Sequence, residues 1–289
     1  MRVAAITMQK NETGMLRQWL HYYAGLCNGF ENIYIFDDAS DDPQVIDQLR
    51  FAVTKGTKVF WNNDRRWKLE DKGILVSNLM RELGTAYDWY FPVDCDELVC
   101  FDSGERPDLS RDAIVSEIVR ASAGGHAALR IDSAFVNIPH TENIYRNTTK
   151  KLVIRGTGKN LTIDPGFHWY DWTKKRDQVG PDILAPSKLA HIHFHFRPFL
   201  MALRFAREKL KNRVVSFDKE TMKNYSGGGY HLAPYFLISE EEYLSWFNKK
   251  ESFSIKSEFD KLGLSVPYSE SREPINEEEL RILLDPVNK

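Results

Sequence analysis

Short apolar runs alternate with helical segments over the first hundred residues, and this alternation limits the folds open to the chain. The apolar runs predict buried strands at 3–9, 32–38, 57–61 and 89–94. The segments between them predict helices at 11–30, 43–53 and 69–86. Such an alternation indicates a parallel, doubly wound sheet, and ligands of these sheets bind beyond the carboxyl ends of the strands.

The pattern changes after residue 100. A capped helix is expected at 110–125, and further strands are expected at 127–138, 150–156 and 188–196. The long stretch 157–187 is rich in Gly, Pro, Lys and aromatic residues, and a loop of this length is usually functional or disordered. Helical spacing returns after Pro198. We therefore expect an α/β protein in which helices flank a mixed sheet over 1–215, followed by a C-terminal helical extension over 216–289.

Composition excludes several classes of protein. The chain of 289 residues has a net charge of −2, so no basic field argues for nucleic acid binding. Three cysteines without a C-x-x-C pair argue against a disulfide framework or a zinc ribbon and fit a reducing compartment. The N-terminus turns polar too early for a secretory signal, and no apolar stretch is long enough to span a membrane. We expect a cytoplasmic protein with at most peripheral membrane association.

Acidic residues gather where the second and fourth predicted strands end, at Asp37 and Asp38 and at Asp94, Asp96 and Glu97. Carboxylates this close repel one another, and burial adds to the cost unless a cation neutralises them. Side chains at i and i+2 of a strand share a face, so Asp94 and Asp96 can converge on one divalent cation. Mn²⁺ or Mg²⁺, which in turn holds phosphate oxygens, suits such oxygen ligands. The alternative is a solvated turn at a strand end.

A second polar cluster lies in the last predicted strand. His191, His193 and His195 alternate with Ile192, Phe194 and Phe196, so the three imidazoles are expected on one face and the apolar side chains in the core. Three such histidines can form a zinc site of their own. They can equally be one hydrogen-bonded histidine and two exposed ones.

Four short motifs in order resemble those of the GT-A glycosyltransferases of the family-two type, and most of all the glycosyltransferase-like family 2 and family-92-like branch. The usual pattern of that branch is K-N-E, E-W, D-x-S-x-D and D-x-D-E-F. In this chain the corresponding positions are Lys10-Asn11-Glu12, Gln18-Trp19, Asp38 to Asp42 and Asp94 to Leu98. Gln18 and Leu98 are mild departures from the pattern. The resemblance covers roughly residues 1–100.

The resemblance implies a GT-A fold with a nucleotide-sugar half at 1–100 and an acceptor half at 101–215. It implies a metal-dependent glycosyltransferase that uses a nucleotide-sugar donor, with a UDP-sugar as the first expectation, and a glycan or glycolipid as acceptor. Transfer would be inverting, with Mn²⁺ or Mg²⁺ as cofactor, and the product would belong to surface-polysaccharide or glycolipid assembly.

The resemblance also implies roles for individual residues. Asp38, or its neighbour Asp37, would accept hydrogen bonds from the base or the ribose. Asp94 would face the ribose or the metal, and Asp96 would ligate the metal, while Glu97 would orient these ligands. The residues that would border the base and ribose are Thr7, Lys10, Asn11 and Glu12.

Relatives in this branch also supply a late histidine to the metal, followed by an arginine. His193 is the first choice for this ligand and His195 the second, because the segment from His193 to Phe199 aligns best with the H-Y-x-x-R-S pattern. Phe and Pro stand here for the Tyr and Ser of that pattern. Arg197 would then meet the diphosphate.

The acceptor site is expected in the middle of the chain. His140, the segment Lys151 to Arg155 and His168 loosely resemble a series found in relatives. An inverting transfer needs a general base, and the resemblance places Asp171 in that role, with Asp164, Glu142 and Asp132 as competitors. Lys174, Lys175 and Arg176 can be a lid near phosphate or a solvated charge run. The aromatic residues that can stack on sugar rings, or simply pack in a core, are Phe167, Trp169, Tyr170 and Trp172.

Two other functions compete with this prediction. A sugar-phosphate nucleotidylyltransferase shares the sheet and the metal chemistry, but it usually has a glycine-rich, Arg- and Lys-bearing loop after the first strand. The segment from Thr7 to Gly14 lacks such a loop. The other competitor is a non-catalytic glycan- or nucleotide-binding module on the same scaffold.

Overall fold

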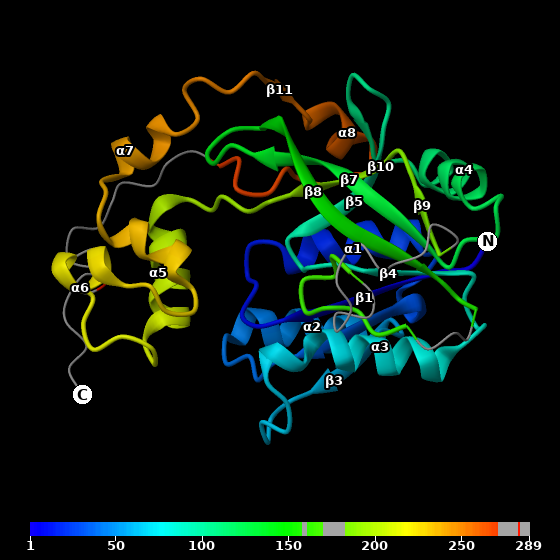
Figure 1. Cartoon of the computed structure of the whole chain (residues 1–289), viewed down its shortest axis with the longest axis horizontal. Helices are drawn as coiled ribbons and strands as arrows, with labels where there is room; N and C mark the ends of the chain where they lie inside the picture. The colour runs from blue at the N-terminus through cyan, green and yellow to red at the C-terminus, as the bar shows by residue number, and fades with distance from the viewer. Residues whose placement is uncertain (158–160, 170–182, 271–282, 284–289) are drawn as a thin grey trace. The chain divides into compact units, whose positions relative to one another are not determined.

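The computed structural model describes residues 1–157, 161–169, 183–270 and 283. Within these residues the chain forms one eleven-stranded mixed sheet flanked by helices (Figure 1). The predicted α/β class, with a mixed sheet between helices, is confirmed. Nine of the strands follow the order β3-β2-β1-β4-β8-β7-β10-β5-β6, while β11 pairs with β8 and β9 pairs with β7.

The first half of the sheet is parallel, as the alternation of strands and helices predicts. β1 pairs in parallel with both β2 and β4, and β2 pairs in parallel with β3. The strands are β1 (Val3–Gln9), β2 (Ile33–Asp37), β3 (Lys58–Trp61) and β4 (Trp89–Pro92). The helical segments between them are α1 (Leu16–Leu26), η1 (Phe30–Asn32), α2 (Pro43–Thr54), η2 (Leu69–Asp71) and α3 (Lys72–Leu83).

The second half of the sheet is mixed. β8 joins the parallel half by pairing antiparallel to β4, and β10 pairs antiparallel to β5 and parallel to β7. The strands are β5 (Glu97–Asp102), β6 (Pro107–Asp108), β7 (Ala128–Asn137), β8 (Asn143–Arg155), β9 (Leu184–Pro186) and β10 (Leu189–His193). The one helix within this part is α4 (Arg111–Ala121) in the described residues, and Ser110 caps its first turn.

Beyond β10 the described chain is mainly helical, in agreement with the prediction of a C-terminal helical segment. Its elements are α5 (Phe199–Leu210), α6 (Lys219–Asn224), η4 (Tyr230–Phe236), α7 (Glu240–Ser245), β11 (Ser252–Ser254) and α8 (Lys256–Lys261). Among the described residues, no helix combines the length and apolar character needed to cross a bilayer.

The chain divides into two compact units. The first contains 1–136, 146–193 and 255–267, and the second contains 137–145, 194–254 and 268–289. The division expected after residue 215 stays a prediction.

One apolar cluster fixes the position of the site in the first unit. Ile6 of β1 and Val76 of α3 lie in this cluster with Phe167, and all three are fully buried. The helix α3 is thereby held against the parallel strands, and the segment around Phe167 packs with them. The start of α3 and the turn after β4 therefore come together at the carboxyl ends of the parallel strands.

Candidate active site

Glu97, His191 and His193 come together because two strands pair far apart in sequence. β10 runs antiparallel to β5 with His193 opposite Glu97, and His191 lies two residues back on the same face of β10. His191 Nε2 is 3.4 Å from Glu97 Oε1, and His193 Nδ1 is 4.0 Å from the same oxygen. The three residues offer ligand atoms that all lie within 4.8 Å of one another. The strand pairing thus builds a cluster of one carboxylate and two imidazoles.

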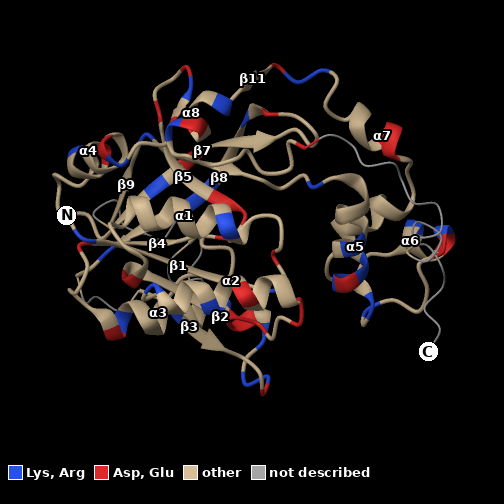
Figure 2. Ribbon diagram, turned by 180° about the vertical axis from the view of Figure 1, so that it is seen from behind, with Lys and Arg blue, Asp and Glu red and all other residues tan. Residues whose placement is uncertain are grey.

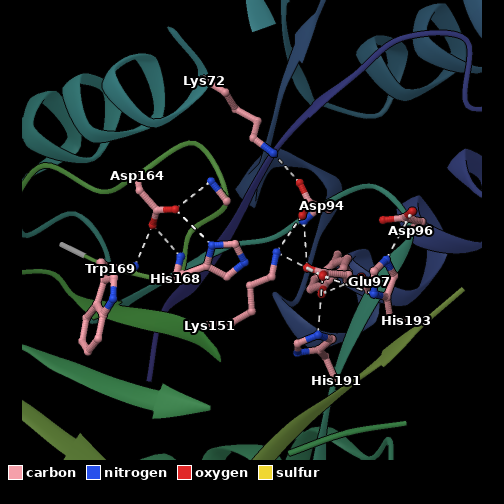
Figure 3. A network of polar contacts seen from close by, with 12 residues as sticks. Lys72, Asp94, Asp96, Glu97, Lys151, Asp164, His168, Trp169, His191 and His193 are labelled. Atoms are coloured by element: carbon pink, nitrogen blue, oxygen red, sulfur yellow. Dashed lines mark hydrogen bonds and ion pairs between the residues drawn. The ribbon is translucent and has the colours of Figure 1, made fainter. Parts of the chain in front are cut away.

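Asp96 joins this cluster from the turn before β5. His193 Nε2 lies 3.5 Å from Asp96 Oδ2, and a dashed line in Figure 3 marks this contact. The argument that Asp94 and Asp96 share a strand face is wrong, because β4 ends at Pro92 and both residues lie between β4 and β5. The turn sends the two carboxylates to different partners.

Asp94 contacts two lysines. Its Oδ1 lies 2.5 Å from Lys72 Nζ, its Oδ2 lies 2.6 Å from Lys151 Nζ, and Lys151 Nζ is also 3.1 Å from Glu97 Oε1 (Figure 3). Lys72 begins α3 and Lys151 lies on β8, so three distant segments build this network. Burial works to raise the pKa of Asp94, but the two ammonium groups outweigh it and hold the pKa well below its usual range. The cations that neutralise Asp94 here belong to the protein itself.

The two histidines of β10 have opposite electrostatic surroundings. Burial lowers the pKa of His191 to about 4, against the attraction of Glu97. Burial also acts to lower the pKa of His193, but Asp96 and Glu97 outweigh it and raise the pKa to about 9. A neutral His191 has a lone pair available, whereas His193 would have to release a proton before its imidazole could ligate a metal.

The cluster fits a divalent cation by its donor chemistry. Imidazole nitrogens and carboxylate oxygens are ligands of Mn²⁺ and Zn²⁺, and Glu97, His191 and His193 hold such atoms close together. Asp96 lies against Nε2 of His193, whereas Glu97 lies on the side of its Nδ1. Within the described part of the chain, the buried Nε2 of His191 makes no hydrogen bond, although it lies 3.4 Å from Glu97 Oε1. An unsatisfied buried nitrogen in the cluster is consistent with a ligand position. Asp94, which the sequence analysis also placed on the metal, has each oxygen on a lysine.

The predicted donor-binding residues after β1 and β2 are linked to one another. Asp37 is 1% exposed, and its carboxylate accepts hydrogen bonds from Gln9 Nε2 (2.5 Å) and Ser40 Oγ (2.6 Å). Burial raises the pKa of Asp37, and the hydrogen bonds from Ser40 oppose the rise. Ser40 Oγ also accepts from the backbone N–H of Asn11 (3.0 Å). Asp37 therefore ties the first two loops together.

Asn11 completes this link. Its φ is +53°, and its side chain donates to Asp41 Oδ1 (2.7 Å) while its Oδ1 accepts from the backbone N–H groups of Asp41 and Asp42. Asp38 accepts from Asn62 Nδ2 (2.8 Å). Asp37 and Asp38, the two residues predicted to contact the base or the ribose, are therefore both engaged in hydrogen bonds within the protein. Their roles toward a donor stay predictions.

The remaining residues expected at the donor site differ in exposure. Lys10 is exposed and Glu12 is half-buried, whereas Thr7 is fully buried in β1. Thr7 Oγ1 has no hydrogen-bond partner among the described residues. A buried hydroxyl in the middle of a strand has no direct route to a donor in this conformation.

A tight loop brings Asp164 and His168 beside the lysine network. Asp164 accepts hydrogen bonds from the backbone N–H groups of Gly166 (3.1 Å), His168 (2.6 Å) and Trp169 (2.6 Å). Its Oδ2 also lies 3.1 Å from His168 Nδ1. Burial acts to raise the pKa of Asp164, but the hydrogen bonds from His168 and the backbone lower it. Asp164, one of the competing candidates for the base, is thus a fully engaged, ionised carboxylate.

The other predicted residues belong to the second unit, to β7 or to the part of the chain outside the described residues. Arg197 belongs to the second unit, where its guanidinium carbon lies 4.1 Å from the centre of the Phe205 ring. His195, His140 and Glu142 are also in that unit, and Asp132 accepts from Arg130 Nε at 2.6 Å. Asp171, the predicted base, lies outside the described residues, as do the residues Tyr170, Trp172, Lys174, Lys175 and Arg176.

Sequence reasoning missed Lys72 and assigned Lys151 to an acceptor segment. Lys72 lies 22 residues before Asp94 and Lys151 lies 57 residues after it. Lys151 had one available signal, because it stands at the head of the apolar run Leu152–Val153–Ile154 in a predicted strand. A lysine at a position that alternates with core residues is rarely buried unless it is paired. Lys72 carried no comparable signal.

The site lies on a mixed α/β sheet beyond the carboxyl end of β4 and combines metal-ligand chemistry with a lysine–carboxylate network. No family model matches the chain, and no curated protein matches it. Among solved structures the chain is similar to TarS residues 1–349 from S. aureus in complex with UDP-GlcNAc. The identity is 10%, the match covers 86% of this chain and 74% of that chain, and the TM-score is 0.43.

Two further solved structures are similar. A mannosyltransferase from Pyrobaculum calidifontis, in complex with GDP-Man and Mn²⁺, shows 12% identity over 84% of this chain and 72% of that chain, with a TM-score of 0.37. Glucosyl-3-phosphoglycerate synthase from Mycobacterium tuberculosis, in complex with Mn²⁺, UDP-glucose and phosphoglyceric acid, shows 15% identity, 47% and 44% coverage and a TM-score of 0.31. Because each TM-score is below 0.5, these similarities carry no argument about activity.

Proposed function

We propose that this protein is a metal-dependent GT-A glycosyltransferase of the family-two type. It transfers a sugar from a nucleotide-sugar donor to a glycan or glycolipid acceptor, with inversion at the anomeric carbon. The preferred donor in this proposal is a UDP-sugar. The observation that carries the proposal is the group of Glu97, His191 and His193, with Asp96 in contact with the same His193, beyond the carboxyl end of β4. The ordered motifs of the first hundred residues support it independently.

The proposed metal position lies between the turn before β5 and the end of β10. Asp96 and His193 are the ligands inferred from the motifs, and Glu97 and His191 offer two more donor atoms on the Nδ1 side of the His193 ring. A bound Mn²⁺ or Mg²⁺ would neutralise the diphosphate and stabilise the charge that develops on it as the sugar leaves. Glu97 shares its Oε1 with Lys151, so it orients the cluster as well as contributing charge.

The lysine network has a separate task in this proposal. Lys72 and Lys151 hold Asp94 in a fixed position, and Asp94 then faces the donor as a restrained carboxylate rather than as a metal ligand. Lys72 is 9% exposed and Lys151 is 5% exposed, so neither is a mobile surface group. The loops after β1 and β2, with Asn11, Asp37 and Asp38, would border the base and ribose.

Calorimetric titration with UDP, with and without Mn²⁺, tests the metal and the donor together. We expect Mn²⁺ to tighten UDP binding by at least tenfold in the wild type, and we expect Asp96→Asn and His193→Ala to remove this gain. Asp47→Asn is the matched control, because Asp47 is an exposed residue of α2. Metal-dependent affinity that survives both variants in folded protein would contradict the proposed metal position.

Product analysis separates the transferase from its competitors. Incubation with UDP-sugars and Mn²⁺ should release UDP, by transfer to an acceptor or slowly to water. Pyrophosphate release from UTP and a sugar 1-phosphate would instead identify a nucleotidylyltransferase. Binding without any turnover would identify a binding module.

A further inference from the structure

The Asp164–His168 pair is a titratable group that the metal cluster and the lysine network do not use. His168 Nδ1 lies 3.1 Å from Asp164 Oδ2. The His168 side chain is 49% exposed, whereas that of Asp164 is 20% exposed. The imidazole is accessible to a substrate, and a less exposed carboxylate orients it from behind. This arrangement suits a general acid or base.

The carboxylate is held by the backbone of its own loop as well as by the imidazole. Asp164 Oδ1 already accepts from the backbone N–H groups of His168 and Trp169, and Oδ2 accepts from that of Gly166. Because these bonds stabilise the ionised carboxylate, Asp164 accepts the hydrogen of His168 Nδ1. An imidazole with its hydrogen on Nδ1 carries its lone pair on Nε2.

Two neighbours fix where the imidazole lies. A Cβ atom on Gly166 would lie 2.1 Å from His168 Cε1 and 2.3 Å from Nδ1, so a side chain at position 166 would displace the ring from this place. Phe167 is fully buried at a φ of +59° and precedes His168 directly. A bulky residue in this backbone region is uncommon and is kept there by its packing.

Phe167 also links the pair to the rest of the site. The centre of its ring lies 4.4 Å from Lys72 Nζ and 5.6 Å from Lys151 Nζ. Figure 3 shows the Asp164–His168 pair beside the network of Lys72, Lys151 and Asp94. Phe167, the residue before His168, thereby packs against the lysines that hold Asp94 in the proposed function.

We propose that His168 is the general base of the transfer and that Asp164 is its positioning residue. The inference rests on the proposed function. The acceptor oxygen forms a bond to the anomeric carbon of the donor sugar, while the bond from that carbon to the diphosphate oxygen breaks. The electron pair of the broken bond stays on the nucleoside diphosphate. The proton of the acceptor hydroxyl moves to His168 Nε2 and then to solvent. With water as acceptor, the same step hydrolyses the donor.

Hydrolysis of a UDP-sugar in the presence of Mn²⁺ tests the base without a known acceptor. We expect His168→Ala to lower turnover by about 10²–10⁴-fold and to leave the calorimetric affinity for UDP unchanged. Added imidazole should restore part of the turnover of His168→Ala. Gly166→Ala should lower turnover by roughly 10–100-fold, because it displaces the ring without removing it. His21→Ala, which changes an exposed histidine of α1, is the matched control and should have no effect.

Three results would overturn the proposal. One is normal turnover in His168→Ala, above all if Asp171→Asn has lost it. Another is an equal loss of UDP affinity and turnover in His168→Ala, which would make His168 a donor-binding residue. The third is independent of activity: long-range ¹H–¹⁵N spectra should show His168 protonated on Nδ1 in the wild type, and protonation on Nε2 would contradict the geometry. A wild type that neither binds UDP nor hydrolyses any UDP-sugar would instead refute the proposed function, and the role of the base would be refuted with it.

Discussion

Lys151 shows how one buried charge can hold a site together. It is 5% exposed and lies within ion-pair distance of Asp94 Oδ2 (2.6 Å) and Glu97 Oε1 (3.1 Å). Burial acts to lower the pKa of Lys151, but the two carboxylates outweigh it and raise the pKa above its usual range. An ammonium group that remains charged at this depth is stabilised by both carboxylates, and each carboxylate depends on it in turn.

Replacing Lys151 with Met should therefore destabilise the protein strongly. The change leaves Glu97 without its nearest cation and Asp94 with Lys72 alone, so we expect a loss of about 3–5 kcal/mol in the free energy of unfolding. Lys150→Met is the matched control, because Lys150 is the exposed neighbour on the same strand, and it should change stability by less than about 0.5 kcal/mol. Urea denaturation at neutral pH measures both. Equal stability of the two variants would show that the buried network is not what stabilises this edge of the sheet.

At the scale of elements, the start of α3 and the 161–169 loop depend on a close approach of two backbones. A Cβ atom on Gly73 would lie 2.2 Å from the carbonyl oxygen of Ile163 and 2.7 Å from the carbonyl carbon of Asp164. Ser77 Oγ bridges the same two segments, since it donates to the Gly73 carbonyl (2.6 Å) and accepts from the Ile163 N–H (2.9 Å). This contact holds the start of α3, where Lys72 lies, against the loop that carries His168.

Gly73→Ala should push these two elements apart. Because the clashing atoms are backbone, we expect a loss of roughly 1–3 kcal/mol in stability and a lower turnover. Gly25→Ala in α1 is the control: its added Cβ meets nothing within 4 Å, so the variant should be neutral or more stable by up to about 1 kcal/mol. Thermal unfolding of the two variants provides the comparison. A Gly73→Ala protein as stable as the wild type would mean that the contact is not needed.

At the scale of the whole molecule, ligand binding should be visible as global stability. A ligand that binds the folded chain alone adds about 2.7 kcal/mol to the free energy of unfolding at one hundred times its dissociation constant. We expect Mn²⁺ and UDP together to stabilise the wild type by more than the sum of their separate effects, because the metal and the diphosphate bind to each other as well as to the protein. Denaturant unfolding with each ligand and with both measures this. In Asp96→Asn the extra stabilisation should vanish, and its persistence there would argue against a shared site.

Much of the fold could be predicted from local signals. The four parallel strands, the three helices between them and the helical C-terminal segment follow from apolar periodicity, which each short segment carries on its own. The strand boundaries near Asp94 could not be predicted, since an apolar run that ends in acid does not reveal where pairing stops. The assumption of a shared strand face for Asp94 and Asp96 failed for this reason.

The sequence by itself determined the α/β class, the edge of the sheet at which polar residues collect and the identity of the acidic and histidine clusters. The partners of those residues were decided by tertiary structure. His193 lies opposite Glu97 through the pairing of β10 with β5, and Asp94 meets Lys72 and Lys151 through the packing of α3 and β8. Periodicity describes how one segment divides its own side chains between two faces. It carries no information on which distant segment lies against each face, and long-range pairing fixes that only when the whole core is assembled.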